Sequence, residues 1–229
     1  MGCAEGKKYG LVGIADHYTE TALDEDGVLH SISFKNDEKF NFAYDVIDVM
    51  AKKCPDKLAM LYVSKEGRER RFSYRDMAKY SNKAANYFSY LGIKRGDKVM
   101  LVLKRHFQFW FSLIALHKIG AVAIPAADLL TKKDFEYRFK VGEIDAIICT
   151  ADGEVSREVD KAARGNSRLR TKIMVGGARE SWHCFNKDIR YFSSNFNRPQ
   201  DAPGGEDPMV MFFTSGTTSY PKITTHCYK

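Results

Sequence analysis

The residues with the clearest chemical potential form a hydroxyl-rich segment near the end of the chain. The segment consists of Thr214, Ser215, Gly216, Thr217 and Thr218. It follows the apolar run 209–213, and Lys222 comes soon after it, directly behind Pro221. Such a loop can surround phosphate oxygens with main-chain N–H and side-chain O–H donors, while its glycine lets the backbone approach closely. The pattern therefore predicts a phosphate-binding loop after a buried strand, although clusters of Ser, Thr, Gly and Pro also form ordinary turns.

The spacing excludes three other loops of similar composition. A Walker A loop requires Gly-Lys followed by Ser or Thr, and that triplet does not occur in the chain. Gly176 and Gly177 lack the remaining spacing of a dinucleotide-binding fingerprint. Ser215 stands between Phe213 and Thr217 rather than between two glycines, so the serine-hydrolase elbow is absent too.

Strands and helices alternate along the chain that must position this loop. The predicted strands are 58–63, 99–103, 121–124, 146–149, 172–175 and 209–213, and the predicted helices are 43–53, 74–91, 107–119, 132–141 and one within 155–163. Ser73 and Thr131 are placed to cap helices, and Gly92 and Gly120 are placed to end them. Because the spacings permit right-handed crossovers, we predict an α/β fold with a mainly parallel sheet and helices on both faces.

Three segments divide the chain. Residues 1–41 show neither helical nor strand periodicity for long and are predicted to be an N-terminal arm. Residues 42–206 form the α/β subdomain, whose last part from 177 on is polar and irregular, with Trp182 and Phe185 as anchors. Residues 207–229 contain the strand and the phosphate loop.

Charge and composition indicate which kinds of partner and which cellular location to expect. The chain carries 36 Lys and Arg against 29 Asp and Glu, but the basic residues are dispersed among acidic ones, which indicates a solvated surface and no nucleic-acid partner. The most apolar stretch, 107–119, is interrupted by Ser112, His117 and Lys118, so we expect no membrane span. The first eight residues lack a hydrophobic signal core, and this predicts a cytoplasmic protein.

The side chains that often bind metals are predicted to have other roles. The five cysteines are far apart without a Cys-x-x-Cys pair, which favours reduced thiols. His106, His117 and His183 have no second histidine at ligand spacing, so we expect packing or surface roles and no metal site. The aromatic run within 107–111 is predicted to belong to the core.

The loop and several other segments resemble a known superfamily. Residues 214–222 match the pattern Thr-Ser-Gly-Thr-Thr-Gly-x-Pro-Lys at every fixed position except Ser219. This pattern is typical of the acyl-adenylate-forming synthetases, which include luciferases and peptide-synthetase adenylation domains. Within them the chain most resembles the medium-chain acyl-CoA synthetases, on segments 40–48 and 95–99 and on Lys222 followed by His226. The resemblance runs from about residue 40 to the end.

The resemblance implies the N-terminal subdomain of an adenylate-forming synthetase and a reaction in two steps. A carboxylate of small to medium chain length attacks the α-phosphate of MgATP, and the thiol of coenzyme A then takes the acyl group from the adenylate. The implied binding residues for ATP are Thr214, Ser215, Gly216, Thr217, Thr218 and Lys222. They would hold the β- and γ-phosphates so that pyrophosphate leaves in line, with Lys222 and Thr217 as the catalytic pair. His226 is either near the acyl or nucleotide site or on the surface of a following helix.

Two departures from the family pattern shape the functional expectation. Ser219 replaces a glycine, which costs about 1 kcal/mol or more if that position has positive φ. In the family, the adenine and ribose contacts, the acidic residue near Mg²⁺, most of the acyl pocket and the C-terminal domain lie beyond the position of Lys229.

We therefore expect that 207–229 is the truncated start of the next subdomain, and that the chain is the N-terminal part of an ATP-dependent carboxylate–CoA ligase, inactive alone. We also expect it to self-associate through an uncovered face at Phe212 and Phe213. The alternative is a catalytically silent truncated protein that binds nucleotide or a protein partner.

Overall fold

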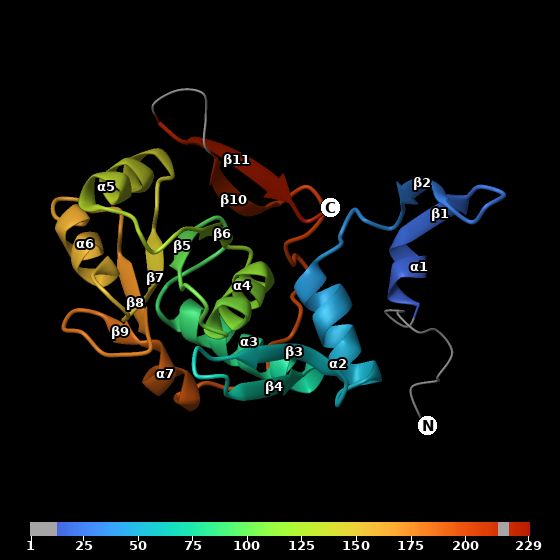
Figure 1. Cartoon of the computed structure of the whole chain (residues 1–229), viewed down its shortest axis with the longest axis horizontal. Helices are drawn as coiled ribbons and strands as arrows, with labels where there is room; N and C mark the ends of the chain where they lie inside the picture. Colours follow the sequence, from blue (N-terminus) through green and yellow to red (C-terminus); the bar gives the residue numbers. More distant parts are fainter. Residues whose placement is uncertain (1–12, 215–219) are drawn as a thin grey trace.

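A seven-stranded sheet forms the centre of the structure (Figure 1). The computed structural model describes residues 13–214 and 220–229. The strand order is β11-β10-β6-β5-β7-β8-β9, and all neighbouring strands are parallel except β10 and β11. The strands are β5 (Lys98–Val102), β6 (Val122–Pro125), β7 (Ala146–Thr150), β8 (Thr171–Val175), β9 (His183–Cys184), β10 (Pro208–Thr214) and β11 (Lys222–Cys227). The predicted mainly parallel sheet is therefore confirmed.

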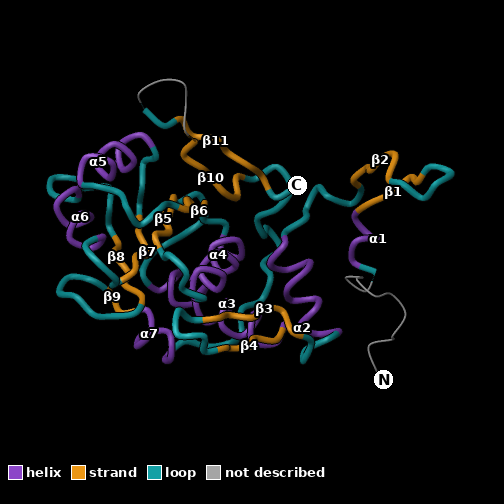
Figure 2. Tube along the Cα trace, in the orientation of Figure 1, coloured by secondary structure: helices purple, strands orange, loops and turns teal. Residues whose placement is uncertain are grey.

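Helices cover both faces of this sheet (Figure 2). They are α3 (Tyr74–Tyr90), α4 (Gln108–Ile119), α5 (Lys132–Val141), α6 (Val155–Ala162) and α7 (Phe185–Asp188). In β5, Val99 and Leu101 belong to the core layer under α3, α4 and α7, whereas Met100 and Val102 belong to the layer under α5 and α6. Successive strand residues point to opposite faces, so a continuous apolar run supplies both layers.

Local sequence signals set the helix ends as predicted. The Asp76 carboxylate accepts the backbone N–H of Ser73 at 3.0 Å, and the Ser73 hydroxyl accepts the N–H of Asp76 at 3.2 Å. Thr131 donates its N–H and its hydroxyl to Asp134 at 2.9 and 2.7 Å before α5. Gly120 ends α4 in the left-handed conformation with φ 76°, which glycine adopts without a steric cost.

A smaller layer packs on α3 and α4. The predicted helix 43–53 is a π-helical segment, η1 (Ala43–Asp48), that continues into α2 (Val49–Lys53). Strand β3 (Leu58–Val63) has the predicted bounds and pairs with β4 (Glu69–Ser73), a strand that was not predicted. Phe72 of β4 and the inward residues of β3 pack with Met77 and Phe111 in a third apolar cluster.

The N-terminal arm contains regular structure that the periodicity did not predict. A short helix, α1 (Ile14–Tyr18), leads into an antiparallel hairpin of β1 (Thr19–Leu23) and β2 (Leu29–Phe34). Every residue of β2 is exposed, and the hairpin stands away from the main body at the right of Figure 1. Because neither face is buried, the sequence has no alternation from which to recognise the strands.

Segment 177–207 is mostly irregular, as expected, and contains β9, α7 and a 3₁₀ turn, η2 (Ile189–Tyr191). Its predicted anchors are confirmed, because Trp182 is 8% and Phe185 is 2% exposed. Among the helices of residues 13–214 and 220–229, none is long and apolar enough to cross a bilayer. Cys149, Cys184 and Cys227 are free thiols, but Cys54 is disulfide-bonded, so the expectation of reduced thiols is wrong for that residue.

Candidate functional site

The strand order marks one edge of the sheet as a place for ligands. Strand β5 is flanked by β6 on one side and β7 on the other, so the chain direction across the sheet reverses there. Ligands of open α/β sheets bind outside the carboxyl ends of strands at such a switch point. Charged side chains follow these strand ends: Lys104, Arg105 and His106 after β5, Asp128 after β6 and Asp152 after β7.

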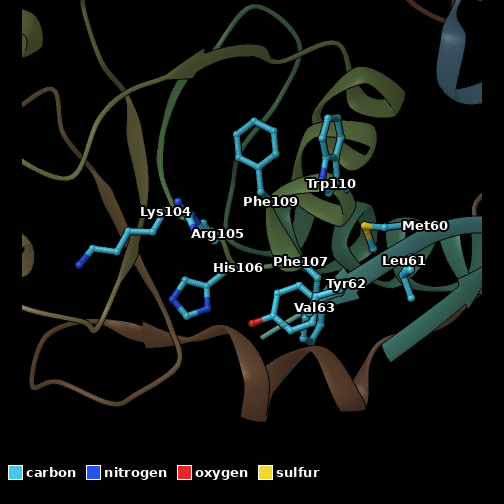
Figure 3. Close-up of a pocket in the computed structure, with 10 residues that line it drawn as sticks. All are labelled: Met60, Leu61, Tyr62, Val63, Lys104, Arg105, His106, Phe107, Phe109 and Trp110. Carbon is cyan, nitrogen blue, oxygen red and sulfur yellow. The ribbon is translucent and has the colours of Figure 1, made fainter. Parts of the chain in front are cut away.

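A pocket of about 380 Å³ opens at this edge. Figure 3 shows Lys104, Arg105 and His106 at one end of it, and the rings of Phe107, Phe109 and Trp110 along α4. Strand β3 contributes the remaining wall with residues 60–63. The pocket thus combines a cationic end with an apolar wall.

Neighbouring side chains hold two of the three basic groups. The Lys104 ammonium pairs with the Asp128 carboxylate at 3.0 Å, and this contact lowers the pKa of Asp128. His106 Nε2 lies 2.7 Å from the Thr150 hydroxyl and 3.4 Å from the Asp152 carboxylate. Arg105 is exposed, and no described residue pairs with its guanidinium. An anion could therefore meet this group without first displacing a partner.

This arrangement differs from the prediction of a packing or surface role for His106, and Lys104 and Arg105 have no predicted role in the sequence. The available signal was three successive basic residues directly after a fully apolar strand. Their importance depends on β5 standing at the switch point, and strand order is not visible in the sequence.

Of the predicted phosphate-loop residues, Thr214 and Lys222 are in the described part of the chain. Ser215, Gly216, Thr217 and Thr218, together with Ser219, lie outside it. Thr214 and Lys222 are directly paired across β10 and β11, and the Thr214 hydroxyl donates to the Lys222 carbonyl at 3.4 Å. Because β10 is parallel to β6, this pair lies at the same carboxyl edge as the ends of β5 and β6.

Helix α5 supports the base of the loop. The Tyr137 hydroxyl donates to the Pro221 carbonyl at 2.8 Å, and its ring stacks on Tyr220 with centroids 4.9 Å apart. Arg138, the next residue, places its guanidinium 5.1 Å from the centre of the Phe213 ring. Both sides of the loop base are therefore fixed to one helix.

The two polar residues of β11 that the resemblance singled out share one face of the strand. Lys222 is exposed, and within the described residues its ammonium has no hydrogen-bond or ion-pair partner. His226 is four residues further on and is also exposed, with its ring 5.8 Å from that of Phe212. The expectation of a helix after the loop is wrong, since these residues form an edge strand paired with β10.

Comparison with known proteins assigns the chain to a protein family. A sequence model described as "AMP-binding enzyme" matches residues 47–227, well over half of the chain. The chain belongs to the AMP-binding enzyme family. The resemblance found in the sequence is confirmed, since the curated relatives are acyl-CoA synthetases of the medium-chain type.

Two human relatives show how far the similarity extends. The chain is 35% identical over 196 residues to mitochondrial acyl-coenzyme A synthetase ACSM5 of Homo sapiens, covering 82% of this chain and 33% of the relative. It is 33% identical over 214 residues to mitochondrial acyl-coenzyme A synthetase ACSM1 of Homo sapiens. This match covers 90% of this chain and 36% of the relative. The chain therefore spans about a third of the length of these relatives.

Solved structures share the fold. The anthranilate CoA ligase AuaEII, in complex with anthranoyl-AMP, matches with a TM-score of 0.70 at 22% identity, covering 83% of this chain and 35% of that one. A fatty acyl CoA synthetase of Mycobacterium tuberculosis matches with a TM-score of 0.67 at 23% identity. This match covers 82% of this chain and 34% of that one. The predicted subdomain of an adenylate-forming synthetase is thereby confirmed at the level of fold.

Proposed function

We propose that this chain binds the triphosphate of ATP through segment 214–222 and serves the first step of carboxylate–CoA ligation. The observation that supports this proposal is the position of the two loop ends. Thr214 and Lys222 meet at the carboxyl edge of a parallel sheet, and the Lys222 ammonium is free to approach an anion. The unpaired Arg105 at the same edge makes its potential more positive, which favours the approach of anionic substrates.

The chemistry that the loop would serve is the departure of pyrophosphate. A carboxylate oxygen bonds to the α-phosphorus of MgATP, and the bond from that phosphorus to the bridging oxygen breaks, leaving acyl-adenylate and pyrophosphate. Lys222 and Thr217 offset the charge that develops on the leaving group, while Thr214, Ser215, Gly216 and Thr218 hold the β- and γ-phosphates. The coenzyme A thiol then attacks the acyl carbonyl, and AMP leaves.

The 229-residue chain taken alone binds nucleotide without turnover in this proposal. Positioning and charge stabilisation supply nearly all the catalysis of nucleotidyl transfer. The relatives named as synthetases are about three times as long as the matched region, so the isolated chain offers only part of their contacts. Catalysis is expected of a longer protein that contains this chain.

Binding of MgATP to the 229-residue chain tests the loop. A fluorescent ATP analogue is titrated against the parent chain, Lys222→Ala and Lys187→Ala, the last being an exposed lysine on α7. A hydrogen bond to a charged group is worth about 1.5–3 kcal/mol, so Lys222→Ala should weaken binding by roughly tenfold or more. Lys187→Ala should bind like the parent. Equal affinity of Lys222→Ala and the parent would contradict the assignment.

Pyrophosphate release separates the proposed role from its alternatives. The isolated chain should release no pyrophosphate above the Lys222→Ala background when a medium-chain carboxylate is added. A longer protein that contains it should release pyrophosphate, and should lose this activity in Lys222→Ala. If the longer protein binds ATP but is inactive, the catalytically silent nucleotide-binding protein is the better description.

A further inference from the structure

The molecule exposes two apolar strand surfaces that carry opposite charge. One is the hairpin of β1 and β2, here called the arm hairpin, and the other is the outer face of the hairpin of β3 and β4. Figure 1 shows the arm hairpin projecting from the main body at the right, whereas β3 and β4 lie against α3 in the lower part of the view.

Large apolar side chains and acidic residues cover the arm hairpin. Leu23, Val28, Leu29, Ile32 and Phe34 are between 48% and 69% exposed. Ile32 and Phe34 are two residues apart in β2, so they share one face of the hairpin. The two strands and their turn also contain four acidic residues and no lysine or arginine. An uncovered apolar patch of this kind marks an interaction surface, and its charge favours a basic partner.

The outer face of β3 and β4 combines exposed apolar residues with positive charge. Leu61 and Val63 are 45% and 53% exposed and alternate with strand residues that face the core. Leu61 is paired with Arg71 across the hairpin. Segment 65–72 contains four basic and two acidic residues. Lys65 and Arg71 are exposed, and their side chains have no hydrogen-bond or ion-pair partner within the described residues. This face therefore matches the arm hairpin in polarity and opposes it in charge.

The base of the arm hairpin is fixed within its own chain. Ile14 is 6% exposed in a cluster with residues of η1 and α2. The ring of Tyr18 lies 4.7 Å from that of Phe40, and the Asn36 amide donates to the His17 carbonyl at 2.8 Å. Both ends of the hairpin are therefore held, and it cannot turn back onto β3 and β4 of the same chain without breaking these contacts.

We propose that the arm hairpin of each chain docks on the outer face of β3 and β4 of a second copy, so that two chains exchange arms in a two-fold dimer. The apolar side chains of the two surfaces pack together, while Glu25 and Asp26 at the hairpin tip approach Lys65 and Arg71. A contact between two different surfaces closes when each copy supplies both of them. Charge complementarity favours this arrangement over the pairing of two arm hairpins, because two acidic surfaces repel each other. This inference does not depend on the proposed function.

Salt dependence tests the charge contribution on the unmodified 229-residue chain. The dimer Kd is measured by sedimentation velocity between about 0.05 and about 0.5 M NaCl, a range over which salt screens exposed charges. The Kd should rise with salt if the acidic tip meets the basic face. A Kd that stays constant or falls, or a chain that stays monomeric at high concentration, would overturn the proposal.

Charge reversal locates the two surfaces. Glu25→Lys with Asp26→Lys makes the hairpin tip basic, and Lys65→Glu with Arg71→Glu makes the strand face acidic. Each double variant should raise the dimer Kd about tenfold or more, because like charges then face each other. If either one dimerises as tightly as the parent, that surface is not part of the interface and the proposal is wrong.

An equimolar mixture of the two charge-reversed variants decides whether the surfaces meet each other. In a mixed dimer, one native arm meets one native strand face, and the other two surfaces are complementary with both signs reversed. The mixture should therefore dimerise with a Kd within about threefold of the parent value. A mixture that associates no better than its components would overturn the proposal.

Two controls separate this docking from other causes. Lys133→Glu with Lys187→Glu reverses two exposed charges on α5 and α7 and should leave the Kd unchanged; an equal loss there would assign the effect to net charge and overturn the proposal. Vesicles of phosphatidylserine test an anionic membrane as the occupant of the basic face. If the parent sediments with these vesicles through Lys65 and Arg71 but forms no dimer, the face binds membranes and the proposal is wrong. Circular dichroism establishes that each variant is folded, and the salt dependence of the parent decides the question if one is not.

Discussion

Tyr137 of α5 donates its hydroxyl to the carbonyl of Pro221 at 2.8 Å. This contact joins a helix on one face of the sheet to the base of the phosphate loop, 84 residues later in the chain. Together with the stacking of Tyr137 on Tyr220, it restricts where the second half of the loop can start. A binding loop whose base is fixed loses less conformational entropy when it closes on a ligand.

Tyr137→Phe should therefore weaken nucleotide binding without unfolding the chain. The variant keeps the ring that stacks on Tyr220 and removes a single hydrogen bond, which is worth about 1 kcal/mol. We expect a loss of about 1 kcal/mol in the free energy of unfolding by urea, and a severalfold rise in the Kd for the ATP analogue. Tyr191→Phe, at a position 80% exposed, is the matched control and should change neither. An unchanged Kd in Tyr137→Phe would show that this contact does not organise the loop.

The role of Lys222 can be separated from general stability in a longer, active protein that contains this chain. Lys222 carries a charge and Thr218 a neutral hydroxyl, so Lys222→Ala should slow adenylate formation more than Thr218→Val does. Thiol attack on preformed acyl-adenylate no longer involves pyrophosphate. Supplied with synthetic acyl-adenylate and coenzyme A, Lys222→Ala should form thioester at close to the parent rate. An equal loss in both half-reactions would assign Lys222 to the fold or to the adenylate phosphate instead.

The N-terminal hairpin leads us to predict that the isolated chain self-associates. The face expected from the sequence contains Phe212 and Phe213, but only Phe212 is 40% exposed, whereas Phe213 packs against the α5 side of the core. The hairpin exposes larger fractions, 69% of Phe34 and 55% of Leu29. Isolated two-stranded hairpins are marginal in water, and exposed apolar patches favour association.

Sedimentation velocity across a range of concentrations measures this association. The parent chain should show a concentration-dependent dimer, and Phe34→Ser with Leu29→Ser should shift it toward monomer. Phe212→Ser should have a smaller effect. A parent chain that stays monomeric at high concentration would exclude the association.

Elements of the fold could be predicted where their sequence signal lies within a few residues. Ser73 with Asp76, and Thr131 before α5, set helix starts through contacts within three residues, and the apolar run of β5 needed no partner to be recognised. Strand β11 was missed although Ile223, Thr224 and Thr225 are β-branched, a composition typical of strands. The hairpin of the arm was missed because its strands bury no face.

Long-range relationships were beyond the sequence. Lys118 was recognised only as an interruption of an apolar helix, yet its side chain is fully buried and its ammonium lies 2.6 and 2.7 Å from the two carboxylate oxygens of Asp48. The amide oxygen of Asn82 accepts from the same ammonium at 2.6 Å. Asp48 precedes Lys118 by 70 residues. The sequence around either residue therefore does not predict the other as its partner.

This buried pair should be sensitive to the loss of one partner. Burial lowers the pKa of Lys118 and raises that of Asp48, and their contact opposes both effects. Asp48→Ala leaves an ammonium without its counterion and should cost about 3–5 kcal/mol in the free energy of unfolding. Glu154→Ala breaks the exposed pair with Arg157 and should cost less than about 1 kcal/mol. The double variant Asp48→Leu with Lys118→Met should recover much of the loss, and urea denaturation of the three variants measures all of these changes.

His117 should make the stability of the chain depend on pH in a defined window. Burial lowers its pKa from 6.5 to about 4, so between these values the unfolded chain binds a proton that the folded chain does not. Stability from this residue is therefore fully present above pH 6.5 and declines as the pH falls toward 4, by about 3 kcal/mol in total. His117→Leu cannot titrate, and subtracting its unfolding free energy from that of the parent at each pH removes the contribution of the carboxylates. We expect this difference to be constant above pH 6.5 and to fall by about 3 kcal/mol by pH 4. Parallel pH profiles for the two proteins would mean that His117 is solvated or paired in solution.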